Sequence, residues 1–196
     1  MLKDKRTAMV GMLALVLFLS SLILTNPGKA LAVNAFLKVD GILGESTDDK
    51  HKDWIEVISW SFGETQPAAG ARSSGGAGAG RVNMQDFKIT MRTSKASPKL
   101  FEAGAAGKHI PKVELDVCKS GGAKEKFLYI KLTDAIVSSF VNLGSSATAD
   151  AYPMEEVMFN FGKIEITYTQ QKRADGSGGG DVKTGYDATA NKIIIP

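Results

Sequence analysis

Two strand-like runs joined by a charged loop constrain the fold of this chain more than any other stretch. Residues 36–39 and 54–62 alternate as β-strands do, with successive side chains on opposite faces. The second run is predicted to place four large apolar side chains on one face: Trp54, Ile58, Trp60 and Phe62. Ile55 and Val57 make the opposite face apolar as well, so we expect protein on both sides of this strand.

The loop between these runs, residues 41–53, is near the upper length of an ordinary connection. Most of its side chains are charged or polar, and such a run is not expected in a core. A loop this long between two strongly patterned strands favours a functional role. His51 lies among acidic residues, but the spacing lacks the glycine and terminal glutamate of an EF-hand. We therefore interpret it as part of a solvated or interfacial charge cluster and predict no metal site.

The rest of the chain repeats the strand pattern. A change of phase near residues 85–86 indicates a bulge or bend in the run 81–93. Further runs are predicted as a hairpin of 110–118 with 126–133, a strand at 135–141, a hairpin of 154–161 with 163–171 that turns around 160–163, and one or two strands within 182–195. Eight or nine short strands separated by turn residues indicate a β-barrel or sandwich. The Gly-rich segments 68–80 and 172–181 are predicted to be flexible loops.

One helix is predicted, over residues 97–107. Ser97 is expected to cap the first amides, Pro98 suits the first helical position, and Gly107 can end the helix in a left-handed conformation. A short apolar stripe should dock this helix on a sheet, and it consists of Leu100, Phe101, Gly104 and Ala105.

The N-terminus has the pattern of a Sec-type signal peptide. Basic residues within 1–6 precede an uncharged apolar run at 8–24, and an Ala-Leu-Ala motif ends at Ala32. Cleavage between Ala32 and Val33 would separate residues 1–32 from a domain of residues 33–196. An uncleaved membrane anchor is the alternative interpretation.

Removal of this segment would leave a neutral protein. Residues 1–32 hold four of the 24 basic residues and one of the 21 acidic residues, so the remaining chain has 20 of each. Nothing in this balance attracts nucleic acid, and contact with a membrane is expected only through an uncleaved N-terminus. Zero net charge favours self-association instead.

No catalytic set is apparent in the sequence. Cys118 is the only cysteine, so an internal disulfide or a cysteine-based metal cluster is impossible, and we expect it to be a small buried hydrophobe. The Gly-rich segment lacks the lysine and following helix of a phosphate loop. We predict no catalytic residue and no cofactor, and His109 is expected only to pair near the helix end. Trp54 and Trp60 could stack on sugars, although core packing is the expected role.

Five segments together resemble the Hcp family, the tube-forming component of bacterial type VI secretion. They are NAFLKVDGILGESTDDKHKDWIEVISWSFG (34–63), KASPKLFEAGAAGKHI (95–110), KLTDAIVSS (131–139), EEVMFNFGKIEITYTQ (155–170) and the tail 180–192. The resemblance implies a small two-sheet antiparallel β-barrel with one flanking helix and a long extended loop. It also implies homohexameric rings that stack into a tube within a contractile sheath, capped by a spike and able to carry small effectors.

The extended loop of that family reaches toward neighbouring subunits and rings. The resemblance therefore implies ring or stacking contacts for Gly44, Glu45, Ser46, Thr47, Asp48, Asp49, Lys50, His51, Lys52 and Asp53. An exported carbohydrate- or protein-binding β-domain that does not assemble is the alternative function. A hydrolase is a third hypothesis, and it lacks a visible catalytic set.

The leader departs from the family pattern, because family members begin near the position of Asn34. Three explanations remain open. The leader is real and the assembly is periplasmic or extracellular, the segment is an uncleaved anchor, or translation starts at Val33 and a cytoplasmic tube is later secreted by the type VI machinery.

Overall fold

The computed structural model describes residues 33–66, 81–120, 125–144, 152–171 and 178–194. The chain divides into two units, Met1–Leu31 and Ala32–Pro196, and every described residue belongs to the second. The expected signal segment 1–32, including Ala32, lies outside the described residues, as does the whole of the Gly-rich segment 68–80. Within the described ranges, no helix combines the length and apolarity needed to cross a membrane.

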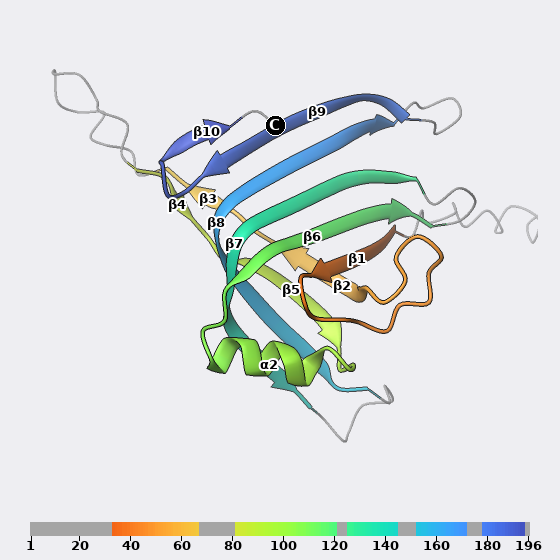
Figure 1. Cartoon of the computed structure of the whole chain (residues 1–196). Helices are drawn as coiled ribbons and strands as arrows, with labels where there is room; N and C mark the ends of the chain where they lie inside the picture. The colour runs from red at the N-terminus through yellow and green to blue at the C-terminus, as the bar shows by residue number, and fades with distance from the viewer. Residues whose placement is uncertain (1–32, 67–80, 121–124, 145–151, 172–177, 195–196) are drawn as a thin grey trace, which may run out of the picture. The chain divides into compact units, whose positions relative to one another are not determined.

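Six antiparallel strands close into a barrel (Figure 1). They are β1 (Val33–Val39), β2 (Ile55–Ser61), β5 (Phe87–Arg92), β6 (Ile110–Lys119), β7 (Lys126–Leu143) and β8 (Met154–Gln171). The order is β8-β5-β2-β1-β6-β7, and β7 pairs again with β8 to complete the ring of hydrogen bonds. The predicted small antiparallel barrel is thus confirmed, and its closure leaves no free edge within the barrel wall.

Short strands extend the barrel at one end. β9 (Gly178–Asp187) pairs with β8, and β10 (Lys192–Ile194) pairs with β9. β3 (Glu64–Thr65) and β4 (Asn83–Met84) form a separate two-stranded sheet. The chain leaves β4 at residues 85–86 and starts β5 directly afterwards, which confirms the predicted break there.

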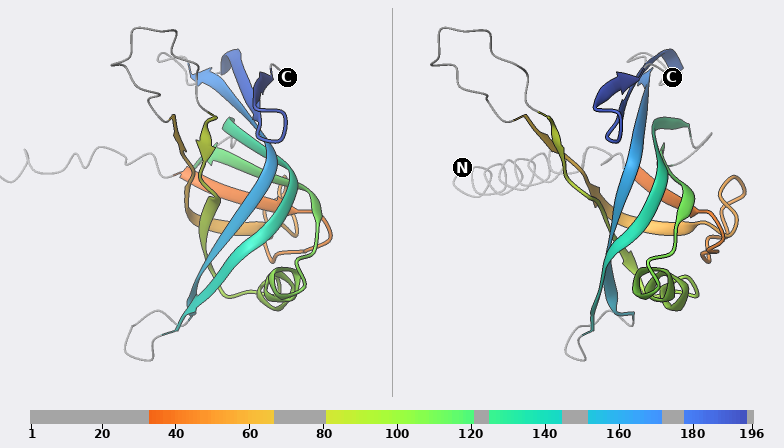
Figure 2. Two further views of the ribbon diagram at one scale, coloured as in Figure 1. Left: turned by 90° about the vertical axis from the view of Figure 1, so that its left-hand side faces the viewer. Right: turned by 60° about the vertical axis from the view of Figure 1, so that its left-hand side comes forward.

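The predicted hairpin turn around residues 160–163 is wrong. β8 runs unbroken for 18 residues beside β7, and Figure 2 shows both strands curving together. The buried positions of β8 change phase between Phe161 and Ile164, and those of β7 change phase at the paired level, between Leu132 and Ala135. Because the buried positions shift in both strands at the same paired residues, the two strands bend together and their hydrogen-bonded pairing continues. Asp134, with φ of 56°, stands at the bend.

The core is formed by the inner faces of the barrel strands and is entirely apolar at its centre. Its fully buried side chains include Leu37, Phe87, Ile89, Met91, Leu115, Ile130, Leu132 and Phe159. At about 25 cal/mol per Å² of apolar surface removed from water, such burial is the main source of stability for a chain without disulfides.

The predicted face of β2 is also wrong. Ile55 and Val57 face the core, and a shift of register between Val57 and Ser59 then turns Trp60 inward and leaves Ile58 49 % exposed. A strict period of two could not reveal this bulge, because the bulge inserts an extra residue into the alternation.

The helix α2 (Ser97–Ala105) packs against β7 near the end of the barrel (Figure 1). Gly107 adopts a φ of 58°, and Lys108 N donates to Ala103 O while Gly107 N donates to Gly104 O. These two bonds are the Schellman pattern, so the predicted left-handed end is confirmed. The apolar stripe is only partly right, because the buried residues are Ser97, Leu100 and Ala103 while Phe101 is 60 % exposed.

Ser97 does not cap the helix through its side chain. Its hydroxyl donates to Oε2 of the buried Glu155 at 2.6 Å. Thr93 and Asn142 donate to Oε1 of the same carboxylate at 3.0 and 2.9 Å. Glu155 therefore ties the start of α2 to β5, β7 and β8 through neutral donors.

Candidate assembly surface

The loop 42–53 is folded back on itself by backbone hydrogen bonds. Gly44 N donates to Asp53 O at 2.7 Å, and Asp53 N donates to Ser46 O at 2.9 Å. Ser46 N donates to Trp54 O at 3.0 Å. A side chain at Gly44 would collide with the carbonyl group of Trp54, so this close approach of two backbone segments requires glycine.

The ten residues with predicted assembly contacts divide into three sets, which are buried, exposed and intermediate. Gly44, Ser46 and His51 are buried against the barrel. The exposed set is Glu45, Thr47, Asp49, Lys50 and Lys52, and Asp48 and Asp53 are intermediate. Only the exposed set can present its side chains to another molecule without rearrangement, and its members carry both signs of charge.

His51 attaches the loop to the barrel wall. Its Nδ1 lies 2.9 Å from Oδ1 of Asp48 in the loop, and its Nε2 lies 3.1 Å from Oδ2 of Asp116 on β6. The ring stacks on Phe36, with centroids 4.3 Å apart and an interplanar angle of 5°, and meets the edge of Trp54 at 4.9 Å. The imidazole is thus fixed by two polar and two aromatic contacts.

This geometry overturns the expectation of a solvated charge cluster at His51, which is only 3 % exposed. Local sequence showed the acidic neighbours but not Asp116, which is 65 residues away. The burial is possible because both ring nitrogens find carboxylate partners, which offsets the cost of removing polar atoms from water. The polar loop does stay out of the barrel core, but His51 is buried between the loop and the outer face of the barrel.

The loop covers part of the outer face of the barrel. Phe36 pairs with Asp116 and Asn34 with Cys118 across β1 and β6, and these side chains point away from the core. Phe36, Asp116 and Cys118 are nevertheless 6, 7 and 1 % exposed. We call these three residues together with His51 the loop-covered cluster.

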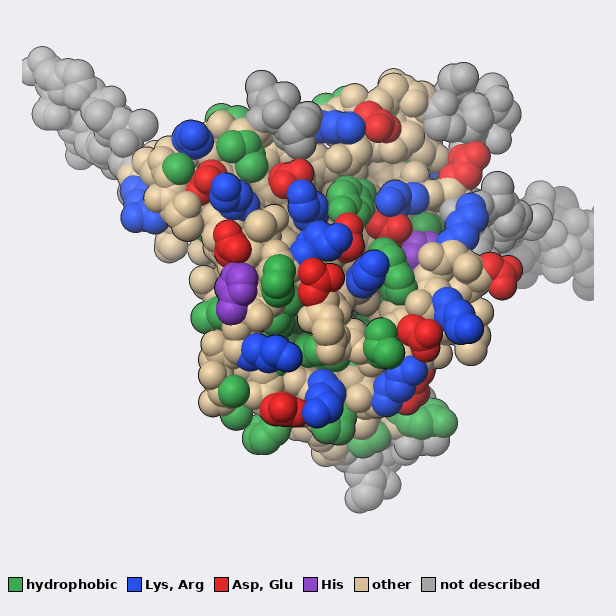
Figure 3. All heavy atoms as spheres, viewed as in Figure 1, with side chains coloured by type: hydrophobic (Ala, Val, Ile, Leu, Met, Phe, Trp, Pro, Cys, Tyr) green, Lys and Arg blue, Asp and Glu red, His purple; other side chains and the backbone are tan. Residues whose placement is uncertain are grey.

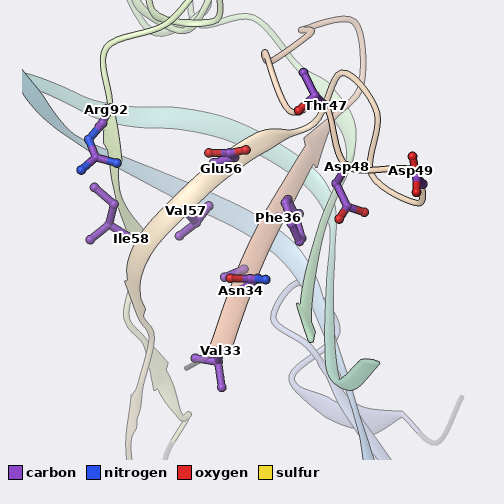
Figure 4. A pocket seen from close by; sticks show the side chains of 11 residues that line it. Val33, Asn34, Phe36, Thr47, Asp48, Asp49, Glu56, Val57, Ile58 and Arg92 are labelled. Carbon is purple, nitrogen blue, oxygen red and sulfur yellow. The ribbon is translucent and has the colours of Figure 1, made fainter. Parts of the chain in front are cut away.

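An open groove of about 430 Å³ runs between the loop and the first two strands (Figure 4). Thr47, Asp48 and Asp49 line it from the loop, and Glu56 and Ile58 line it from β2. Its wall therefore combines acidic groups with an exposed apolar side chain.

Surface contacts add to the attachment of the loop. Lys95 N donates to Oε1 of Glu45 at 2.8 Å, and Lys95 Nζ lies 3.1 Å from Oδ1 of Asp53. Both side chains of the second pair are close to half exposed, so solvent screens it strongly.

The other candidate residues show no reactive arrangement. Cys118 is buried, and desolvation raises the pKa of its thiol, which disfavours the nucleophilic thiolate. His109 is exposed, and its Nε2 lies 3.1 Å from Oδ1 of Asp134. In the described ranges, no group of three or more His, Cys, Asp or Glu side chains is placed to hold a metal ion.

The two tryptophans do not form a shared platform for sugars. Trp54 meets the His51 ring, and Lys38 Nζ lies 5.8 Å from its centroid. Trp60 packs against the core instead. Core packing, the expected role of both rings, therefore holds for Trp60, whereas Trp54 contacts the loop residue His51.

This architecture is that of a small closed barrel with an external loop held firmly to its wall. The family model described as "Type VI secretion system effector, Hcp" matches residues 36–168. "Protein hcp1" of Pseudomonas aeruginosa is 37 % identical over 162 residues, which are 82 % of this chain and 98 % of that protein. The chain therefore belongs to the Hcp family of type VI secretion proteins.

Solved structures agree with this assignment. One described as a type six secretion system protein has a TM-score of 0.77 and 31 % identity, with 83 % of this chain and 100 % of that chain covered. Hcp1 from Salmonella typhimurium has a TM-score of 0.69 and 36 % identity, with 84 and 100 % covered. The resemblance seen in the sequence is thus confirmed at the level of family and fold.

Proposed function

We propose that this protein is a structural subunit that assembles with copies of itself into hexameric rings, which stack into a tube for type VI secretion. Family membership is the observation that carries this proposal. A subunit of this kind works by its contacts and transforms no molecule, and the sheath, spike and small effectors are its proposed partners.

The exposed apolar surface supports assembly. One face of β8 points into the core within the barrel. Beyond the barrel, the same face continues across the paired strands β9 and β10, and its side chains there are exposed. Cross-strand neighbours Tyr168 and Val182 are 44 and 66 % exposed there, and Ile193 is 73 % exposed. A groove of about 360 Å³ lies beside this face, lined by Phe62, Met84, Ile166, Tyr186 and Ile193 among others. Apolar surface of this kind is typical of sites that another protein covers.

The surface charges support the same interpretation. Lys and Arg side chains alternate with Asp and Glu over the face in Figure 3, without a large region of one sign. A cyclic ring needs two different surfaces that fit each other around the circle, and mixed charges can set their register. The exposed side chains of the loop are suited to that role because the loop backbone is held in one conformation.

The site of assembly depends on the N-terminal segment. We propose that residues 1–32 are a signal peptide cut between Ala32 and Val33, which gives a periplasmic or extracellular assembly. A retained anchor, or a start at Val33 with secretion of a cytoplasmic tube, would give the other locations. The first described residue, Val33, begins β1. Mass spectrometry of the mature N-terminus distinguishes these cases: a free amine on valine supports cleavage, and an initiator methionine at this position supports the later start.

The assembly itself is tested by light scattering of the purified protein and two variants. The first combines Asp49→Lys with Lys52→Glu on the exposed side of the loop. The control combines Lys99→Glu with Glu102→Lys on α2, which exchanges an exposed ion pair without changing net charge. We expect hexamers from the wild type and the control, and smaller species from the loop variant.

The outcomes separate two claims. A wild type that stays monomeric at high concentration would contradict the proposed function. A loop variant that assembles as the wild type does would leave the function intact and remove the loop from the contact surface.

A further inference from the structure

His51 differs from the other histidine of this chain, because both of its ring nitrogens face carboxylate oxygens. The sequence contains two histidines, and the other, His109, contacts Asp134 through Nε2. At His51 the contacts are 2.9 Å to Asp48 and 3.1 Å to Asp116. Ionised carboxylates only accept hydrogen bonds. Both contacts are therefore satisfied only when both ring nitrogens carry a proton, which is the imidazolium form.

The charges around the cluster agree with ionised carboxylates. Lys126 of β7 places Nζ 3.2 Å from Oδ1 of Asp116 as an ion pair, although no described donor is aligned for a hydrogen bond to that oxygen. Asp48 Oδ1 also accepts hydrogen bonds from Lys50 N and His51 N. A protonated Asp116 could donate to a bare Nε2 of a neutral His51 ring, but it would no longer carry the negative charge that faces Lys126.

Other ionisable groups nearby belong to three elements. On β6, Cys118 interacts electrostatically with Asp116 and also with Asp48 and Lys50 of the loop. On β7, Tyr129 interacts with Asp116 and hydrogen-bonds Glu114. On β1, Lys38 Nζ lies 5.8 Å from the ring centroid of Trp54. Of the side-chain types present here, histidine is the one that ordinarily changes its charge at pH values around neutrality.

Loss of one proton from His51 has a definite structural effect. The neutral ring has one N–H, so one nitrogen would present a lone pair to a carboxylate oxygen in a site with almost no water access. The two sides of that contact would repel each other, and the loop would lose either its internal bond to Asp48 or its bond to β6. The attachment therefore weakens when the ring loses this proton.

We propose that protonated His51 is a latch that holds the assembly loop against β6, so that loop order and self-assembly decrease as pH rises through the range in which histidines lose their proton. Its role is to position the exposed loop side chains. The latch follows from the described contacts alone, whereas its effect on assembly rests on the proposed function.

The first test observes the wild-type protein and uses a variant only to assign the signals. Nitrogen-15 NMR of the imidazole rings in the purified protein distinguishes a doubly protonated ring from either neutral tautomer. At about pH 5.5 we expect imidazolium signals for the ring of His51, which is recognised by its loss in His51→Gln, and a change of that ring at higher pH together with shifts of loop amides. A neutral His51 ring at the lowest pH at which the protein is folded would overturn the proposal.

The second test measures loop order by hydrogen exchange at about pH 5.5 and 8.5, with rates corrected for the intrinsic effect of pH. The amides of Gly44, Ser46 and Asp53 report the loop. We expect their protection to fall roughly tenfold or more at the higher pH in the wild type and in His109→Gln, because a charge-assisted bond is lost. In His51→Gln protection should be low at both values. Equal protection at both values in the wild type would overturn the latch.

Cys118 provides an independent readout, because it is the sole thiol, is buried, and interacts electrostatically with Asp48 and Lys50 of the loop. At one fixed pH, alkylation should be several-fold faster in His51→Gln than in the wild type and His109→Gln. Light scattering at both pH values then completes the series. Loss of protection without any assembly at either pH would confirm the latch and contradict the proposed function, so the two failures are distinguishable.

Discussion

Two histidine–aspartate contacts of this protein, one at each histidine, have the same chemistry and opposite surroundings. His51 and Asp116 approach to 3.1 Å with side chains 4 and 10 % exposed, and His109 and Asp134 approach to 3.1 Å with side chains 60 and 55 % exposed. Water competes for the second pair and hardly reaches the first. An equal distance therefore does not imply an equal contribution, since burial decides how much is lost when one partner is removed.

The comparison also separates two kinds of position in the fold. His109 follows the end of α2 and contacts the bend of β7, where the barrel is already closed by backbone hydrogen bonds. His51 lies in a segment outside the barrel ladders and attaches that segment to the wall. A polar contact matters most where no sheet or helix provides an alternative set of bonds.

The largest effect is expected from Asp116→Asn compared with Asp134→Asn. The first removes the buried carboxylate charge that His51 and Lys126 share, and it should lower the free energy of unfolding by about 2–4 kcal/mol. The second should cost less than about 1 kcal/mol, because the pair is exposed and asparagine tolerates the left-handed conformation of residue 134. Urea unfolding measures both. Equal losses in the two variants would break the comparison.

An intermediate effect is expected from Glu155→Gln. This buried carboxylate is held by Ser97, Thr93 and Asn142, which are neutral donors. Glutamine keeps the shape of the side chain but turns an N–H donor toward these groups. The free energy of unfolding should therefore fall by about 1–2 kcal/mol. If urea unfolding instead gives a loss as large as that of Asp116→Asn, burial of a carboxylate and not its pairing with a cation would set the cost.

The smallest effect is expected from Lys95→Ala. Its ammonium pairs with Asp53 at the other end of the loop in a half-exposed contact, so the loss should be below about 0.5 kcal/mol. Hydrogen exchange of the loop should barely change, because the backbone bond of residue 95 to Glu45 remains. A loss of loop protection comparable to that of His51→Gln would show that the loop is held from its surface.

The sequence predicted those parts of the fold that depend on local patterns. The helix end at Gly107 and the β6–β7 pairing follow from glycine placement and from alternation within short runs. The continuous path of β8 was missed because a change in which side chains are buried along one strand resembles a turn. Only the matching change at the paired positions of β7 shows that the strand bends and continues.

The sequence predicted which segment forms the candidate assembly loop, but it did not predict the contacts that this loop makes with the barrel. The resemblance identified residues 44–53, but the local pattern placed His51 in a solvated or interfacial charge cluster. The partner of His51 on the barrel, Asp116, alternates with Leu115 and Val117, and this pattern predicts that the face of β6 carrying Asp116 is exposed to solvent. That a loop would cover this outer face could not be inferred from β6 itself, because the covering segment is more than 60 residues away.

Native mass spectrometry of the purified protein tests the central claim most directly, because it counts the copies that remain together. Self-assembly predicts a dominant species of six chains at low pH, with the loop variant Asp49→Lys and Lys52→Glu shifted to fewer chains. A single chain as the only species at every concentration and pH would contradict the claim that this protein functions by packing against copies of itself.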